Sequence, residues 1–155
     1  MSGGDIASHL SMLLGEHGLE PRGWFAIESG DIPAGSKAVT AGSAALLIGN
    51  HGPAMWDAFR QSPEYRDGVA HPMDRWTRRI VEGALPQLGV RATALFPFGG
   101  EIWPFQRFAR RAMGLQSSPL GLLIHPQYGL WHALRAASVF PEMVSVAPVQ
   151  AGQHR

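Results

Sequence analysis

The stretch AALLIGN, residues 44–50, is an uninterrupted apolar run that ends in a Gly-Asn-His-Gly turn. A run of this length, bounded by turn residues, is typical of a β-strand that is buried on both faces. Such a strand lies inside a sheet and has other elements packed above and below it. The sequence therefore predicts a central strand over 44–50.

The segment before this strand predicts a helix followed by a second strand. Apolar residues recur at helical spacing at Ile6, Leu10, Leu13 and Leu14, and Gly18 follows as a C-terminal stop. Residues 23–28, GWFAIE, are rich in residues that favour strands, whereas 32–44 contain the Pro and Gly of a turn.

The segment after the strand predicts two helices that begin at prolines. Pro53 suits the first position of a helix whose apolar face is Met55, Trp56 and Phe59, with Trp56 as a core residue. Residues 63–68, PEYRDG, are expected to form a polar loop. Pro72 starts the second helix, whose buried stripe is Met73, Trp76, Ile80 and Ala84. Arg75, Arg78 and Arg79 lie off that stripe and predict a solvated face.

The last third of the chain predicts a strand over 91–100, a helix that opens at Pro104 and an antiparallel hairpin. In that helix Phe105, Phe108 and Ala109 face inward, Arg107, Arg110 and Arg111 face outward, and Gly114 ends it. The hairpin pairs 120–124 with 131–140 through the loop HPQYGL. Helices interspersed with strands that end in a hairpin predict an α+β domain over 1–142 and an irregular tail over 143–155.

Composition excludes several classes of function. The chain has 155 residues, 45% of them apolar and 16% charged, which predicts one folded domain. A formal charge of +1 without a Lys/Arg run argues against nucleic-acid binding. The absence of cysteine excludes disulfides, thiolate metal sites and iron-sulfur clusters within this chain. No secretory signal or membrane span is evident, so a cytoplasmic protein without a membrane partner is expected.

The common catalytic motifs are also missing. Ser43, Ser117 and Ser118 are not part of a G-x-S-x-G turn, which disfavours a hydrolase. His125 and His132 do not have the spacing of a common metal motif, so no metal site is expected. The FGG sequence at 98–100 does not lead into a helix with a lysine, which disfavours phosphate binding.

Arg135 is the residue that points most directly to a ligand. Strict alternation would place it on one face with Trp131, Ala133, Ala137 and Val139, and His132, Leu134, Ala136, Ser138 and Phe140 on the other. A guanidinium among apolar and small residues needs a partner, because burial of an unpaired charge is costly. That partner is either an internal carboxylate, such as Asp57 or Asp74, or an anionic group of a ligand held bidentately.

Tyr128, Gly129 and Trp131 form an aromatic group next to a glycine in the predicted loop. A glycine lets the backbone approach a planar ring, and the aromatic side chains offer contact area at low entropic cost. The same residues would equally well cap the turn of a hairpin, so both interpretations stay open.

These residues carry a resemblance to a known family. GLLIHPQYGLWHALR, 121–135, resembles the His-Pro-x-aromatic-Gly-x-Trp-x-x-x-Arg segment of the CblC (MMACHC) cobalamin-processing proteins. LLIGNHGPAMWDAF, 46–59, and HPMDRWTRRIVEGALPQL, 71–88, are similar to two further segments of that family. The resemblance covers roughly residues 18–142.

The resemblance implies a nitroreductase-like α+β fold with a mainly antiparallel central sheet flanked by helices. Family members bind cobalamin with its lower base detached and remove its upper ligand with a reduced flavin or glutathione. Carried over by position, the residues that line the cobalamin cleft are His125, Pro126, Gln127, Tyr128, Gly129 and Trp131. Arg135 matches an arginine near the corrin and the thiol, where it would meet a glutathione carboxylate or a corrin amide.

The chain also departs from the family. The additional C-terminal region of the animal proteins is missing, and with it part of their glutathione site. Bacterial ferredoxin-like relatives, similar at 97–100, 104–107 and 118–133, continue into a cysteine-rich cluster segment, whereas this chain contains no cysteine. The main hypothesis is therefore a corrinoid-binding domain that assists cobalamin reduction or dealkylation.

Two alternatives remain beside that hypothesis. One is the cluster-free module of a ferredoxin-like electron-transfer protein, and the other is a flavin-binding reductase on the same fold. The residues show no evident catalytic acid, base or nucleophile. An electron-donor protein as partner and a homodimer over the cleft are left open by the sequence.

Overall fold

The strand predicted over 44–50 is the centre of the sheet. The computed structural model describes residues 2–50, 53–113, 116–117, 123–124 and 133–144. Its main sheet has the order β1-β2-β6-β3, and every neighbouring pair is antiparallel. The strands are β1 (Leu19–Ala26), β2 (Ser43–Asn50), β3 (Thr93–Leu95) and β6 (Ala133–Val144). All eight residues of β2 are buried, which confirms the predicted central strand.

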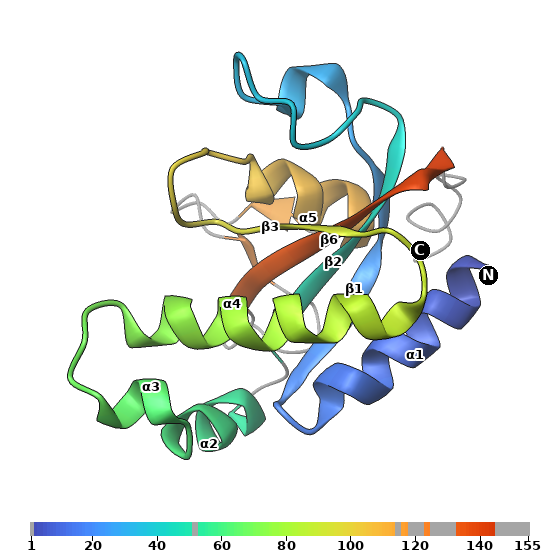
Figure 1. The fold of residues 1–155 in the computed structure, drawn as a ribbon. Helices are drawn as coiled ribbons and strands as arrows, with labels where there is room; N and C mark the ends of the chain where they lie inside the picture. Colours follow the sequence, from blue (N-terminus) through green and yellow to red (C-terminus); the bar gives the residue numbers. More distant parts are fainter. Residues whose placement is uncertain (1, 51–52, 114–115, 118–122, 125–132, 145–155) are drawn as a thin grey trace.

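Helices cover both faces of this sheet (Figure 1). They are α1 (Gly3–Gly15), α2 (Ala54–Arg60), α3 (Pro63–Arg66), α4 (Pro72–Ala84) and α5 (Phe105–Met113). Short 3-10 helices occur at Ser29–Asp31 and Leu85–Leu88. The predicted α+β class, with a mainly antiparallel sheet flanked by helices, is confirmed.

Alternate residues of the central strands face two separate cores. Leu46 and Ile48 of β2 join the side chains of α1, α2 and α4 on one face. Ala45 and Leu47 join α5 on the other face, where Phe108 stacks on Phe25 with ring centroids 4.6 Å apart. Because both faces of β2 are occupied, its sequence contains no polar residue between Ser43 and Asn50.

The longer helices follow the predicted patterns. In α4, Pro72 occupies the first turn, and Trp76, Ile80 and Ala84 are buried. In α5, Phe105, Phe108 and Ala109 are buried as expected. α1 begins with a capping box between Ser2 and Asp5, and Gly18 follows its end in the left-handed conformation with φ of 71°.

Two predictions between β2 and α4 are wrong. Trp56 is 45% exposed, because Met55 and Phe59 form the buried face of α2 and Trp56 lies at its edge. Residues 63–66 form the helix α3 instead of a polar loop, because the Ser62 side chain caps the Tyr65 N–H and Pro63 occupies the first turn.

Arginines of α4 and α5 form ion pairs with neighbouring elements. The prediction that these helix faces are simply solvated did not include such pairs. Arg75 pairs with Asp67 at 2.8 Å, and Arg79 pairs with Glu64 at 2.6 Å, so α3 is fixed on α4. Arg111 of α5 pairs at 2.6 Å with Asp31, whose side chain is 1% exposed.

The predicted hairpin between 120–124 and 131–140 does not form in the described residues. β5 (Leu123–Ile124) pairs with β4 (Gln116–Ser117) in a separate two-stranded sheet. β6 instead lies between two other strands, because β2 pairs along its length on one edge and β3 pairs with residues 137–139 on the other. β6 also continues past Pro141 to Val144, and residues 145–155 are outside the described part.

Candidate functional site

Arg135 is the one predicted site residue that the structure describes. It is half-buried near the beginning of β6. His125, Pro126, Gln127, Tyr128, Gly129 and Trp131 lie outside the described residues, so their predicted role in lining a cleft stays a prediction. The candidate site is therefore built from the surroundings of Arg135.

Arg135 is the extra residue of a β-bulge. On β6, Ala136 pairs with Ile48 and Leu134 pairs with Gly49, which leaves Arg135 without a partner on β2. A bulge breaks the strict alternation of faces and turns a side chain away from its regular direction. Leu134 accordingly packs in the same core as Ala137 and not in the core of Ala136. The predicted face of Leu134 is therefore wrong, and the predicted faces of Trp131 and His132 lie outside the described residues.

A second bulge faces the same part of β2 from the other side. On β1, Pro21 pairs with Ile48 and Gly23 pairs with Leu47, so Arg22 is the extra residue. The Arg22 side chain is 6% exposed and pairs with Glu20 at 3.0 Å. Two arginines thus leave the regular ladder on opposite sides of one end of β2.

Asn50, the last residue of β2, contacts both of these arginines. Its backbone carbonyl accepts a hydrogen bond from Nη2 of Arg22 at 2.5 Å. Its side-chain Oδ1 accepts one from Nε of Arg135 at 3.4 Å. We call Arg22, Asn50 and Arg135 the arginine junction. Asn50 is buried, so the junction is a fixed part of the sheet end.

The guanidinium of Arg135 has an unusual electrostatic environment. Burial lowers its pKa, and the charge of Asp74 on α4 acts in the opposite direction. Within the described part of the chain, Asn50 is its one hydrogen-bond partner and no carboxylate lies within ion-pair distance. Of the two carboxylates expected as partners, Asp57 pairs with Arg60 at 2.9 Å, and Asp74 acts on Arg135 only through its field.

Asp74 also lines a cavity of about 410 Å³ at the beginning of α4. The lining residues are His71, Asp74, Arg75, Arg78, Phe98 and Gly99. We call this the α4 cavity. It has the volume of a small-molecule site and combines an aromatic wall with a few charged groups.

Aromatic rings hold Arg78 in place at the wall of the α4 cavity. Its guanidinium carbon lies 4.5 Å from the ring centre of Phe96 and 5.5 Å from that of Phe98. The same side chain pairs with Glu82 at 3.3 Å. A smaller hollow of about 230 Å³ lies beyond Arg78 and shares Phe98 and Gly99 with the α4 cavity.

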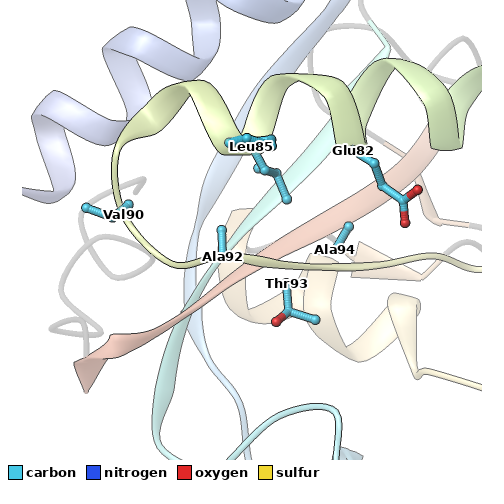
Figure 2. A pocket seen from close by; sticks show the side chains of 7 residues that line it. Glu82, Leu85, Val90, Ala92, Thr93 and Ala94 are labelled. Carbon is cyan, nitrogen blue, oxygen red and sulfur yellow. The ribbon is translucent and has the colours of Figure 1, made fainter.

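Another cavity, of about 350 Å³, lies between the end of α4 and the edge strand β3 (Figure 2). It is lined by Glu82, Leu85, Val90, Ala92, Thr93 and Ala94, so its charged groups are limited to Glu82. The cavity does not include Arg135 or Asp74 and is not the site that the sequence indicates.

Two other features are missing from the described residues. In that part of the chain, no cluster of three or more His, Asp or Glu side chains could hold a metal ion. There is also no helix long and apolar enough to cross a membrane among the residues that the structure places.

Arg22 and Asn50 were not predicted as members of the site. Asn50 had one available signal: it is the polar residue that ends the apolar run of β2. Arg22 had none, because a bulge depends on the pairing of strands and leaves no local pattern in the sequence.

Comparisons with known proteins give a likeness in fold. No family model matches the chain, and no curated protein matches it. Among solved structures, it is similar to the C. elegans B12-trafficking protein CblC, a homologue of human MMACHC, with a TM-score of 0.69 and 19% sequence identity. The similarity covers 92% of this chain and 71% of that protein. The chain therefore shares the α+β fold of this B12-trafficking protein, as the resemblance in sequence predicted.

Proposed function

We propose that this chain binds a corrinoid, and that Arg135 is one of the residues that contact it. The observation that supports this most directly is a desolvated guanidinium that has a single described hydrogen bond, at 3.4 Å to Asn50. It lies on a fold that the chain shares with a B12-trafficking protein. A ligand contact is the simplest reason to keep an arginine in such a position.

The chemistry of Arg135 suits the rim of a corrin. A guanidinium has N–H donors on three nitrogens, and in the described residues only Nε of Arg135 has an acceptor. Corrins carry peripheral amide side chains, whose carbonyl oxygens are acceptors for such donors. The α4 cavity, which is lined by Asp74 and not by Arg135, has a volume of about 410 Å³ and so has room for one edge of such a macrocycle and not for all of it.

The proposal extends to assistance in reduction or dealkylation of the bound corrinoid. The chain has no cysteine, so its own residues supply no thiol for this step. In dealkylation, the thiolate of glutathione would accept the alkyl group as a thioether, and the electrons of the broken bond would stay with the corrinoid. In reduction, a reduced flavin or an electron-donor protein would supply the electrons, while the protein positions the corrinoid in both cases. Release of the upper ligand on addition of glutathione or reduced flavin, compared with a sample without protein, tests this extension.

A binding titration with variants tests the main proposal. We expect cobalamin to bind the wild type, and Arg135→Gln to weaken binding about tenfold or more through loss of charge-assisted hydrogen bonds. Arg60→Gln is the matched control, because Arg60 is an exposed arginine on α2 that pairs with Asp57. Equal affinities of wild type and Arg135→Gln would contradict the assignment of Arg135.

The two alternative functions give different results in the same experiment. Flavin binding without corrinoid binding, seen as a yellow protein after purification with added flavin, would indicate the reductase. Binding of neither molecule would leave the electron-transfer module as the remaining interpretation.

A further inference from the structure

Asn50 connects two β-bulges through two different oxygen atoms. Its backbone carbonyl accepts a hydrogen bond from Nη2 of Arg22 at 2.5 Å, and its side-chain Oδ1 accepts one from Nε of Arg135 at 3.4 Å. The Arg22 side chain is 6% exposed and also pairs with Glu20 at 3.0 Å, so it fixes the backbone at the end of β2. The side chain of Asn50 therefore extends from a fixed backbone to the bulge of β6.

The bond between Asn50 and Arg135 orients the guanidinium more than it stabilises the fold. At 3.4 Å it is longer than a typical N–H···O bond of about 2.9 Å, so its contribution to folding is small. A guanidinium is planar and rigid, however, and a bond at Nε restricts the directions in which its two Nη groups can point. Within the described residues, Asn50 occupies Nε and leaves the fork of Nη donors available for an acceptor.

The burial of Asn50 is unusual for a carboxamide. Asn50 is 4% exposed, at the end of a strand whose residues from Ala44 to Ile48 are all apolar. A buried carboxamide costs free energy unless its polar atoms are hydrogen-bonded. An arginine also loses much rotamer freedom when it binds a ligand. Because Asn50 restricts the rotamers of Arg135 beforehand, less affinity is lost in ordering that side chain on binding.

We infer that Asn50 is a positioning residue for the ligand contact of Arg135: it holds the guanidinium in its binding orientation before the ligand arrives. The inference rests on the proposed corrinoid binding and adds a residue that acts through Arg135. Arg22 supports Asn50 through the backbone carbonyl, so every replacement of the Asn50 side chain keeps that support and changes the contact with Arg135.

Two replacements of Asn50 separate orientation from packing. Asn50→Ala and Asn50→Asp both remove the NH₂ group, whereas Asn50→Asp alone keeps an acceptor oxygen for Nε. Ser43→Ala is the matched control, because Ser43 is a buried polar residue, 2% exposed, at the opposite end of the same strand. Urea denaturation shows whether each variant is folded.

The first measurement uses the protein without ligand. The Nε–H signal of Arg135 in a ¹⁵N NMR spectrum is assigned by its loss in Arg135→Gln, and its exchange with water is measured. We expect slow exchange in the wild type, Asn50→Asp and Ser43→Ala, and exchange about tenfold faster in Asn50→Ala, because the acceptor is lost. Equal exchange in the wild type and Asn50→Ala would overturn the inference, whether or not a corrinoid binds.

The second measurement is a double-mutant cycle of cobalamin affinity over Asn50→Ala and Arg135→Gln. We expect Asn50→Ala alone to weaken binding about fivefold, because Arg135 is no longer held in place, and less than about twofold when Arg135→Gln is already present. Asn50→Asp should recover most of the affinity, and Ser43→Ala should keep the wild-type value.

Two results of the cycle overturn the inference, and they differ in what they say of the proposed function. If Asn50→Ala weakens cobalamin binding equally in both backgrounds, or in neither, Asn50 does not act through Arg135 and corrinoid binding stands. If the folded wild type binds no cobalamin, the proposed function is wrong and the inference is wrong with it.

Discussion

Oδ1 of Asn50 accepts a hydrogen bond from Nε of Arg135 at 3.4 Å, across a bulge that removes Arg135 from the regular ladder of β6. The backbone carbonyl of the same asparagine accepts from Arg22, the bulge residue of β1. The end of the central strand therefore contacts the side chains of Arg22 and Arg135, which a regular sheet would place elsewhere. This geometry connects the fold to the proposed ligand contact.

Replacement of Arg135 by leucine should impair binding more than folding. We expect Arg135→Leu to change the free energy of unfolding by about 1 kcal/mol or less, because removal of a desolvated charge offsets the loss of one long hydrogen bond. Cobalamin affinity should decrease in the same variant. Urea denaturation and a binding titration measure the two effects.

Arg111→Leu provides the structural comparison for that variant. Arg111 pairs at 2.6 Å with Asp31, whose side chain is 1% exposed, and its loss leaves a buried carboxylate without that partner. We expect a loss of about 3 kcal/mol. If Arg135→Leu is destabilised as much as Arg111→Leu, Arg135 has a structural role that the proposed ligand contact does not include.

The ion pair between Glu64 and Arg79 should make the free energy of unfolding depend on pH in the acid range. Hydrogen bonds from Arg79 lower the pKa of Glu64 below its ordinary value of 4.5. A carboxyl group whose pKa is lower in the folded state contributes stability above its unfolded pKa and loses it as the pH falls through the folded value. The wild type should therefore lose stability as the pH falls below about 4.5.

Two variants of this pair test the cause. Glu64→Gln should be about 1 kcal/mol less stable at pH 7, and its stability should decrease less toward low pH. Arg79→Gln should show the same flattening, because it removes the donor that lowers the pKa. Stability curves from pH 7 to pH 3 that are parallel for wild type and both variants would show that the pair contributes no pH dependence.

Gly18 and Gly35 show two different reasons for a glycine: a positive φ at both positions, and close backbone packing at Gly18 alone. Both have positive φ, at 71° and 80°, but a Cβ on Gly18 would lie 2.2 Å from the backbone nitrogen of Met55, whereas none of the described atoms lies within 4 Å of a Cβ on Gly35. We expect Gly35→Ala to cost about 1 kcal/mol and Gly18→Ala about 3 kcal/mol or more. Similar costs in thermal unfolding would mean that α1 and α2 are not in close contact at Gly18.

Trp56 and Trp76, each predicted on the apolar face of its own helix, should differ in how much stability is lost when they are replaced by alanine. Trp76 is 1% exposed and contacts the ring of Phe59, whereas Trp56 is 45% exposed. We expect Trp76→Ala to cost about 4 kcal/mol and Trp56→Ala about 1 kcal/mol. Equal destabilisation in chemical denaturation would restore Trp56 as a core residue.

Patterns that depend on local sequence predicted much of the fold. The apolar run at 44–50 identified β2, because a strand buried on both faces tolerates no polar residue inside it. Pro72 and the stripe from Met73 to Ala84 identified α4, because the helical period and the proline agree. Trp56 was wrongly predicted to be buried. Helical spacing shows which half of a helix is apolar, but it does not show how far the neighbouring elements cover that half.

Features that depend on pairing between distant strands could not be predicted in the same way. The hairpin was predicted because its two strands are close in the sequence, yet β6 pairs with β2 and β3, which come from much earlier in the chain. The bulge at Arg135 follows from that pairing, so alternation alone placed Leu134 on the wrong face. Arg135 itself was identified because a charge in an apolar row is conspicuous in any register.

The visible spectrum of cobalamin tests the central claim most directly. A corrinoid bound with its lower base detached absorbs differently from free cobalamin, so the spectrum reports binding and its mode together. We predict a saturable shift to the base-off spectrum when purified protein is added in excess, and a markedly weaker shift with Arg135→Gln. A spectrum that stays unchanged at saturating concentrations of folded wild-type protein would contradict the account.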